Sequence, residues 1–179
     1  MRVFQHTADG PGSSPASPRV QLLALVGFVG LCLLVGAADG AAIGGSVGSW
    51  YLTLDPPPGT PPTWLFAPVW TLLYGLLGAA AWLVWRRPTP VSLTLGQRRA
   101  LITWGWQLLL NAAWSPVFFG LHSPALGLVV ILPLLAMIVL TMRRFARLKP
   151  LAAWLLLPYA AWTCYAVYLN IGFFWLNPG

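Results

Sequence analysis

The sequence predicts an all-α membrane protein built as a five-transmembrane-helix bundle. Three observations lead to this prediction: 58% of the 179 residues are hydrophobic, only 7% are charged, and apolar windows long enough to span a bilayer recur along the chain. A soluble domain carries about 25% charged residues and keeps much of its surface in water. A soluble protein with an oversized core, a secreted disulfide scaffold, a disordered chain and a nucleic-acid-binding module are therefore excluded.

Five windows reach the length of about 20 residues that a helix needs to cross the hydrocarbon core. An odd number of crossings places the two termini on opposite sides of the membrane. Residues 1–18 are rich in Gly, Pro and Ser and are expected to form a disordered tail, which leaves residues 19–179 as the transmembrane domain. The windows are Val20 to about Ile43, Trp64–Trp85, Ala100–Leu121, Ala125–Met142 and Leu151–Trp175.

The first window also resembles a cleaved secretory signal, because Arg19 precedes the apolar run Val20–Val35 and small residues follow it. That run exceeds the usual signal-peptide length of about 7–15 residues, so we interpret it as a helix. Small residues continue after that run at every fourth position, which indicates either the close approach of a second helix or a loose helix end. These are Gly36, Gly40, Gly44 and Gly48.

The charges between the windows predict the orientation of this multi-pass protein. All ten cations fall on one face of the predicted bundle, before the first window or in the second and fourth connections. The positive-inside rule then places the N-terminus in the cytoplasm and the C-terminus outside. The net charge of +7 is thus a topology signal, and no nucleic-acid partner is expected. The cations are Arg2, Arg19, Arg86, Arg87, Arg98, Arg99, Arg143, Arg144, Arg147 and Lys149.

Patterns of conventional catalysis and metal binding are missing from the sequence. Cys32 and Cys164 lie in apolar windows without CxxC spacing and are interpreted as small buried hydrophobic residues. No phosphate-binding loop, HExxH motif or nucleophile elbow occurs. Asp39, near the outer end of the first window, is interpreted as a solvated helix end, with a functional intramembrane carboxylate as the alternative. We therefore predict no catalytic residue, no metal site and no required cofactor.

The 11 Trp residues separate into two groups. Trp70, Trp114 and Trp162 lie about 9, 10 and 20 Å below the outer face at the α-helical rise. Above them, five prolines stiffen the segment Asp55–Pro62, here called the proline loop, which is expected to act as a lid. The other Trp residues lie near window ends, where aromatic rings anchor helices at the lipid headgroups. These are Trp50, Trp64, Trp82, Trp85, Trp104, Trp106, Trp154 and Trp175.

Helical spacing places polar side chains on the same faces as the deep Trp residues. Amides face lipid at a cost, so Gln107, Asn111 and Asn170 should point into the bundle. They either bond to one another between helices, at about 0.6 kcal/mol each, or line a concave pocket for a large, flat, mostly apolar ligand. The three stripes are Trp70 and Tyr74; Gln107, Asn111 and Trp114; and Tyr159, Trp162, Ala166 and Asn170.

Four linked motifs resemble those of the TspO/MBR family of tryptophan-rich sensory proteins and translocator proteins (peripheral benzodiazepine receptors). The resemblance covers residues 20–175 and implies a homodimeric five-helix receptor or carrier in the bilayer. It also implies that tetrapyrroles such as protoporphyrin and haem, and in some members sterols or drug-like molecules, bind in a pocket under the first outer loop. The motifs are Trp50-Tyr51-x-x-Leu54-x-Pro56, Pro61-Pro62-x-Trp64-x-Phe66-x-Pro68-Val69-Trp70-Thr71-x-x-Tyr74, Asn111-x-x-Trp114-x-Pro116-x-Phe118-Phe119-Gly120 and Pro158-Tyr159-x-x-Trp162-x-x-x-Ala166-x-x-Leu169-Asn170.

The resemblance carries a set of pocket residues onto this chain. Gln107 joins the set from its stripe, and porphyrin or haem is then a ligand and not a required cofactor. A sensor or carrier of tetrapyrroles is the preferred function. The alternatives are light- and oxygen-dependent porphyrin degradation, with Trp70 and Trp162 as electron donors, and a structural membrane partner without a ligand. The implied lining is Trp50 or Tyr51, Trp70, Tyr74, Asn111, Trp114, Trp162, Ala166 and Asn170.

Three features depart from the family pattern. The proline loop begins Asp55-Pro56-Pro57-Pro58 where the family usually has Lys-Pro followed by Trp, so a lid cation is missing. No Lys or Arg follows Tyr165 or Tyr168, so the cholesterol motif of animal members is absent, although Arg143-x-Phe145-x-x-Leu148 matches its reversed form. The N-terminal tail is longer than the family pattern predicts.

Overall fold

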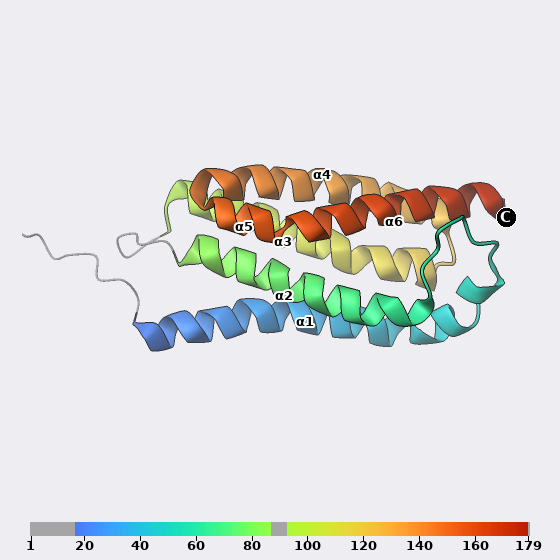
Figure 1. Cartoon of the computed structure of the whole chain (residues 1–179), viewed down its shortest axis with the longest axis horizontal. Helices are drawn as coiled ribbons and strands as arrows, with labels where there is room; N and C mark the ends of the chain where they lie inside the picture. Colours follow the sequence, from blue (N-terminus) through green and yellow to red (C-terminus); the bar gives the residue numbers. More distant parts are fainter. Residues whose placement is uncertain (1–16, 87–92, 179) are drawn as a thin grey trace, which may run out of the picture.

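The computed structural model describes residues 17–86 and 93–178, which form a bundle of long helices (Figure 1). Residues 1–16 of the predicted tail, which spans residues 1–18, lie outside the described residues. In the described segments every regular element is helical, as the sequence predicts. The elements are α1 (Pro18–Gly48), η1 (Tyr51–Thr53), η2 (Thr63–Leu65), α2 (Phe66–Trp85), α3 (Leu95–Ser115), the π-helical turn η3 (Pro116–Gly120), α4 (Pro124–Leu148), α5 (Pro150–Leu155) and α6 (Leu157–Leu176).

Four helical segments of the described chain are long and apolar enough to cross a membrane. Their outward faces carry large apolar side chains, for example Leu23 and Leu34, which are 71% and 70% exposed. Such surfaces require lipid, so the chain is an integral, multi-pass membrane protein. The third predicted window falls in α3, which is not among the four. The four are Pro18–Gly45, Thr63–Trp85, Pro124–Leu148 and Pro150–Leu176.

Local signals set where the helices begin. The Ser17 hydroxyl accepts a hydrogen bond from the Val20 amide at 3.4 Å, and Pro18 occupies the first turn, so α1 starts inside the segment predicted as tail. Thr94 and Gln97 form a reciprocal capping box at the start of α3. The Gln97 amide also donates to the Val84 carbonyl at 2.9 Å, which ties α3 to the end of α2.

Proline residues end or bend two helices that were predicted to be continuous. The window Leu151–Trp175 contains Pro158, which has no N–H and collides with the preceding turn, so α5 and α6 are separate helices. The Leu156 amide instead bonds to the Ala153 carbonyl at 3.1 Å. The third window is likewise divided, because α3 ends before Pro116 and the chain continues as η3.

The described cations lie at one end of the bundle, where α1 and α3 begin and α2 and α4 end (Figure 1). α4 extends beyond its predicted end at Met142, so Arg143, Arg144 and Arg147 belong to its last turns. Arg144 donates to the Arg99 carbonyl at 2.9 Å and to the Thr103 hydroxyl, which joins α4 to α3. The sorting of cations predicted from the sequence is therefore seen in the fold for the described residues.

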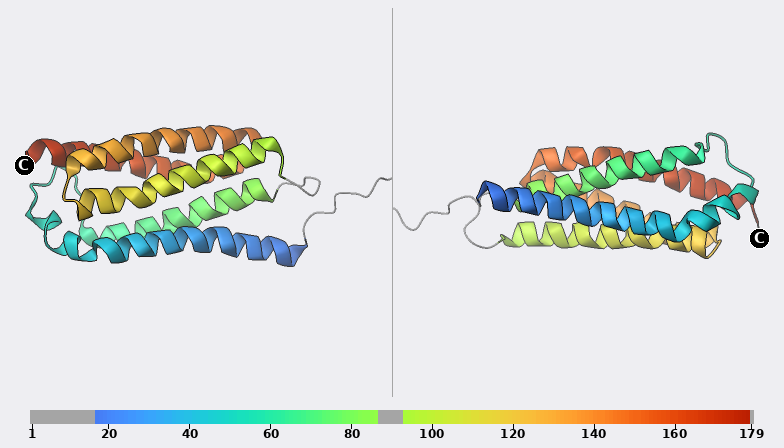
Figure 2. Two further views of the ribbon diagram at one scale, coloured as in Figure 1. Left: turned by 180° about the vertical axis from the view of Figure 1, so that it is seen from behind. Right: turned by 90° about the horizontal axis from the view of Figure 1, so that it is seen from below.

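Glycine allows α1 and α2 to pack closely side by side (Figure 2). A Cβ on Gly78 would lie 2.6 Å from the Val29 Cα and 2.7 Å from the Phe28 carbonyl oxygen, so only glycine fits this crossing. In the glycine stripe on α1, a Cβ on Gly36 would meet the Tyr74 ring at 2.5 Å. The close approach predicted for this stripe is therefore seen at Gly36 but not at Gly40 or Gly44, where a Cβ would meet no atom within 4 Å.

Two predictions about burial are wrong. Trp104 does not anchor a helix at the lipid headgroups as predicted. It is 6% exposed and packs edge-on against Phe28, with ring centroids 5.6 Å apart. Its position near a window end did not reveal that this face of α3 packs against α1. Cys164 is exposed and not buried, because its face of α6 turns out of the bundle, whereas Cys32 is fully buried as expected.

Candidate functional site

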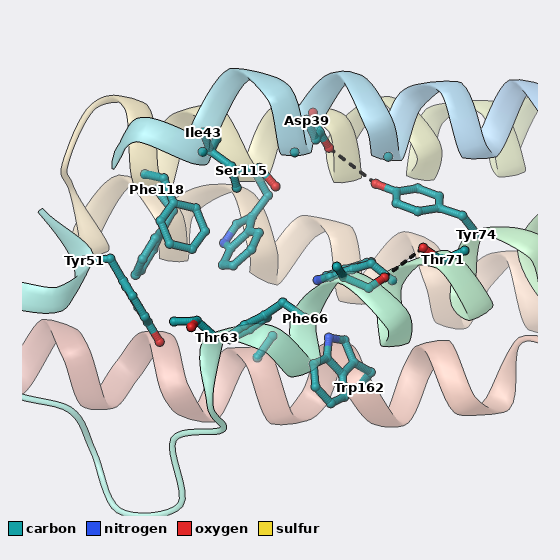
Figure 3. Close-up of a pocket in the computed structure, with 18 of the residues that line it drawn as sticks. Asp39, Ile43, Tyr51, Thr63, Phe66, Thr71, Tyr74, Ser115, Phe118 and Trp162 are labelled. Carbon is teal, nitrogen blue, oxygen red and sulfur yellow. Dashed lines mark hydrogen bonds between the residues drawn. The ribbon is translucent and has the colours of Figure 1, made fainter. Parts of the chain in front are cut away.

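A cavity of about 490 Å³ lies inside the bundle, between α1, α2, the α3–η3 corner and α6 (Figure 3). We call it the aromatic cavity, because side chains of Trp, Tyr and Phe form much of its wall. Its size falls within the range of about 300–1,000 Å³ that is usual for small-molecule sites. Ring-bearing residues of its wall are Tyr51, Phe66, Trp70, Tyr74, Trp114, Phe118, Phe119, Trp162, Tyr165 and Phe173.

The wall formed by α2 and α6 is built from rings at helical spacing. Trp70 lies one turn before Tyr74, with ring centroids 5.6 Å apart. Trp162 packs edge-on against Phe66 at 6.3 Å and against Tyr165 at 5.6 Å (Figure 3 labels Phe66 and Trp162). Such contacts hold each ring in place, so this wall presents fixed flat surfaces to the cavity.

The opposite wall depends on Trp114, which stacks on Phe118 at 5.3 Å. Its indole N–H donates to the Asn170 side-chain oxygen at 3.3 Å, and the Asn170 amide donates to the Pro124 carbonyl at 2.7 Å. Gly127 makes room for this bridge, since a Cβ there would lie 2.7 Å from the Asn170 oxygen. Asn170 thus fixes Trp114 and joins α6 to the start of α4.

A polar chain crosses the inner part of the cavity. The Tyr74 hydroxyl donates to the Asp39 carboxylate at 3.4 Å, drawn as a dashed line in Figure 3. The Asn111 side-chain amide donates to the Tyr74 hydroxyl at 3.1 Å. Asp39 lines the cavity and is not the solvated helix end expected from the sequence. The position of its carboxylate agrees with the alternative prediction, a carboxylate inside the membrane.

The proline loop is held against α6. The Tyr168 hydroxyl donates to the Pro58 carbonyl at 2.9 Å, and the Tyr165 hydroxyl donates to the Gly59 carbonyl. Gly59 has a positive φ of 83°, a conformation that favours glycine. Pro57 occupies the space where a Cβ on Gly172 would lie, 2.5 Å from the Pro57 Cβ.

The base of the proline loop is held by paired hydrogen bonds. The Asp55 amide donates to the Asn177 side-chain oxygen at 2.9 Å, and the Asn177 amide donates back to the Asp55 carbonyl at 3.1 Å. Backbone groups of the loop thus make the contacts to α6, although the loop lacks the cation of the family pattern. Tyr51 lies beside this loop, and burial raises the pKa of its hydroxyl to about 12, so the group is neutral at physiological pH.

Most of the residues predicted to bind a ligand come together at the aromatic cavity. Asn111 does not line the cavity, but its side-chain amide donates to the hydroxyl of Tyr74, which does. The predicted residues that line the cavity are Tyr51, Trp70, Tyr74, Trp114, Trp162, Ala166 and Asn170.

Two other predicted residues lie elsewhere. Trp50 stacks on His122 with centroids 4.8 Å apart and borders a separate outer groove, because successive residues in this turn point in different directions. Gln107 is buried two turns below Trp114, and its amide has no hydrogen-bond partner among the described residues. The i,i+4,i+7 stripe places Gln107 on the correct face but about 10 Å too deep.

The contribution of α1 to the wall was not predicted. Its lining residues follow the i, i+3, i+4, i+7, i+8 spacing of one helix face, but the residues of α1 are apolar on nearly every side and do not tell which face meets the cavity. Tyr165 was also missed, although it lies three residues after Trp162 and on the same face. The α1 lining includes Gly36, Asp39, Gly40, Ile43 and Gly44.

Comparison with known proteins finds relatives over most of the chain. The chain is 42% identical to "Tryptophan-rich protein TspO" of Chlorobaculum tepidum over 163 residues, covering 88% of this chain and 98% of that protein. It is 37% identical to the protein of the same name from Archaeoglobus fulgidus, covering 88% and 99%. It is 36% identical to the human "Translocator protein", covering 68% and 70%. Residues 28–176 match the TspO/MBR family, and the chain therefore belongs to it.

Proposed function

We propose that this protein binds tetrapyrroles, or similar flat and mostly apolar molecules, in the aromatic cavity, and that it senses or carries them. One observation supports the proposal most: Trp70, Trp114 and Trp162, from three different helices, line one cavity. Each ring that stacks on a flat ligand adds about 0.5–1.5 kcal/mol beyond the burial of apolar area. Three such rings are enough to favour a planar ligand over a lipid chain.

The proposal includes five membrane crossings, with α3 as the third. α2 ends where α3 begins, and α4 begins near the far end of α3, so α3 has to run the length of the bundle between two crossing helices (Figure 1). Gln97, Gln107 and Asn111 lower its hydropathy, but all three are buried inside the protein. Polar residues of this kind are tolerated in a membrane when they face other helices.

We also propose that the N-terminus is cytoplasmic and the C-terminus is outside. The described cations gather at the end of the bundle where α1 starts, and the positive-inside rule assigns that end to the cytoplasm. The aromatic cavity and the proline loop then lie in the half of the bundle away from the cytoplasm. A homodimer is part of the proposal and is tested by measuring the mass of the protein in lipid nanodiscs.

Quenching of Trp fluorescence tests the binding proposal. Purified protein in nanodiscs is titrated with protoporphyrin IX in the dark, and saturable quenching is expected. Trp114→Ala removes a stacking surface and should weaken binding by about ten-fold or more. Trp154→Ala is the matched control, because Trp154 is 68% exposed on the outside of α5 and should leave the affinity unchanged.

Equal affinity in the parent protein, Trp114→Ala and a Trp70→Ala/Trp162→Ala variant would refute the proposal. The titration repeated under illumination separates binding from degradation. Stoichiometric binding without a new absorbing product favours a sensor or carrier. Loss of porphyrin absorbance that needs light, oxygen and Trp162 favours the degrading activity.

A further inference from the structure

Asp39 is the only acidic residue in the four described helical segments that could cross a membrane, and its side chain lines the aromatic cavity. It lies nine residues before the end of α1, about 14 Å along the helix axis. A carboxylate at such a depth is costly, and charged groups inside membrane proteins usually face a cavity or a partner. Its position facing the cavity therefore calls for a ligand group that matches it.

The neighbours of Asp39 hold its carboxylate in place but leave most of its acceptor capacity unused. A carboxylate offers about four acceptor sites. Among the described residues it receives one side-chain hydrogen bond, from the Tyr74 hydroxyl at 3.4 Å. Asn111 donates to the same hydroxyl oxygen, so the hydroxyl hydrogen is free to point at Asp39. Gly36 gives the Tyr74 ring the space it needs beside α1.

Two other polar side chains of the wall are already engaged, and the Tyr51 hydroxyl of the wall makes no hydrogen bond to Asp39 or to any other described residue. The Thr71 hydroxyl donates to the Ala67 carbonyl at 2.8 Å, and the Asn170 side chain is committed to Trp114 and Pro124. Of the described residues that line the cavity, none is Lys, Arg or His. A donor that meets the remaining acceptor sites of Asp39 therefore has to come from the ligand or from water.

We propose that Asp39 makes the aromatic cavity selective for flat apolar ligands that carry a cationic nitrogen, or another N–H donor, on their edge. The same carboxylate excludes ligands that would place an anionic group at this position. A tetrapyrrole would then bind with its acidic substituents directed away from Asp39. This inference rests on the proposed function, because it specifies which members of the flat-ligand class the same cavity accepts.

Three probes with one ring system test the inference. Pyrenemethylamine, pyrenemethanol and pyrenecarboxylate share a flat apolar ring and differ in the charge of a single substituent. Binding to protein in zwitterionic nanodiscs is followed by energy transfer from Trp to pyrene, with empty nanodiscs as the background for partitioning into lipid. Asp39→Asn keeps the size and the acceptor for Tyr74 but removes the charge. Asp55→Asn is the matched control, because the recorded hydrogen bonds of Asp55 involve its backbone.

The parent protein is expected to bind the amine at least ten-fold more tightly than the alcohol, and the carboxylate most weakly. Asp39→Asn should bring the amine to the level of the alcohol and strengthen binding of the carboxylate, whereas Asp55→Asn should behave like the parent. An amine preference that survives Asp39→Asn overturns the inference, as does its absence in the parent protein.

Protoporphyrin IX titrations of the same variants separate this inference from the proposed function. If Asp39→Asn binds protoporphyrin but the pyrene probes show no dependence on residue 39, the inference is wrong and the proposed function stands. If the parent protein fails to bind protoporphyrin while the amine preference depends on Asp39, the tetrapyrrole proposal is wrong and the selectivity stands. Protoporphyrin binding by Asp39→Asn also shows that this variant is folded.

Discussion

The contacts between the proline loop and α6 should control how fast a ligand leaves the aromatic cavity. The Tyr168 hydroxyl donates to the Pro58 carbonyl at 2.9 Å, and this side chain is not part of the cavity wall. Tyr168→Phe removes one hydrogen bond from the closed loop while keeping the ring. A hydrogen bond of this kind contributes about 0.5–1.5 kcal/mol, so the dissociation rate should rise about two- to twelve-fold.

Adding Tyr165→Phe removes the second bond, to the Gly59 carbonyl. The two hydroxyls together correspond to about 1–3 kcal/mol. The Tyr165 and Tyr168 rings stack with centroids 6.2 Å apart, so the effects of the two substitutions on the dissociation rate should not be strictly additive. Tyr159→Phe is the control, because the Tyr159 hydroxyl has no hydrogen-bond partner among the described residues and its side chain does not line the aromatic cavity, so its loss should not speed dissociation.

The assay is stopped-flow dissociation of protoporphyrin IX, followed by the recovery of Trp fluorescence when excess empty nanodiscs capture the released ligand. Faster dissociation in Tyr168→Phe and in the double variant, with Tyr159→Phe unchanged, supports a loop that retains the ligand. Equal dissociation rates in the parent, the single and the double variant would show that the ligand leaves by a path that avoids the loop.

Two glycine substitutions test the packing that forms the cavity. Gly78→Ala places a Cβ 2.6 Å from the α1 backbone, which cannot move aside as a side chain can. The substitution should lower the free energy of unfolding by about 1–3 kcal/mol, measured by thermal unfolding followed by circular dichroism. Gly75→Ala is the control, because a Cβ there meets open space and should not lower stability. Gly127→Ala places a Cβ 2.7 Å from the Asn170 oxygen and should weaken protoporphyrin binding several-fold by displacing Trp114. Gly105→Ala is its control, because a Cβ there meets open space. An unchanged affinity in Gly127→Ala would mean that the Asn170 bridge does not position Trp114.

Helical geometry explains which parts of the site could be predicted. A rise of about 1.5 Å per residue places Trp70 and Trp114 about 9–10 Å and Trp162 about 20 Å below the outer face, beneath one end of the bundle, and these three rings do share one cavity. The same geometry misplaced Gln107, because a shared face does not imply a shared depth. A proline inside a helical window removes a backbone hydrogen bond, which accounts for the break before Pro158, but Pro133 lies within the continuous α4, so a proline alone does not predict a break.

The rotation of α1 could not be predicted in the same way. Its residues are apolar on nearly every side, so no amphipathic stripe indicates which face meets the other helices. Whether Asp39 faces headgroups, lipid or a cavity depends on that rotation, which the packing of Gly78 against Val29 sets in three dimensions. Trp104 shows the same limit, because only the position of Phe28 on α1 reveals that its ring is buried.

A structure of the protein determined in nanodiscs with protoporphyrin IX shows directly where the ligand binds. We expect the macrocycle to lie in the aromatic cavity, in contact with Trp70, Trp114 and Trp162, with the proline loop closed over it and its acidic substituents away from Asp39. A macrocycle bound in the outer groove beside Trp50 and His122, or on the lipid-facing surface with the cavity filled by side chains, would contradict it.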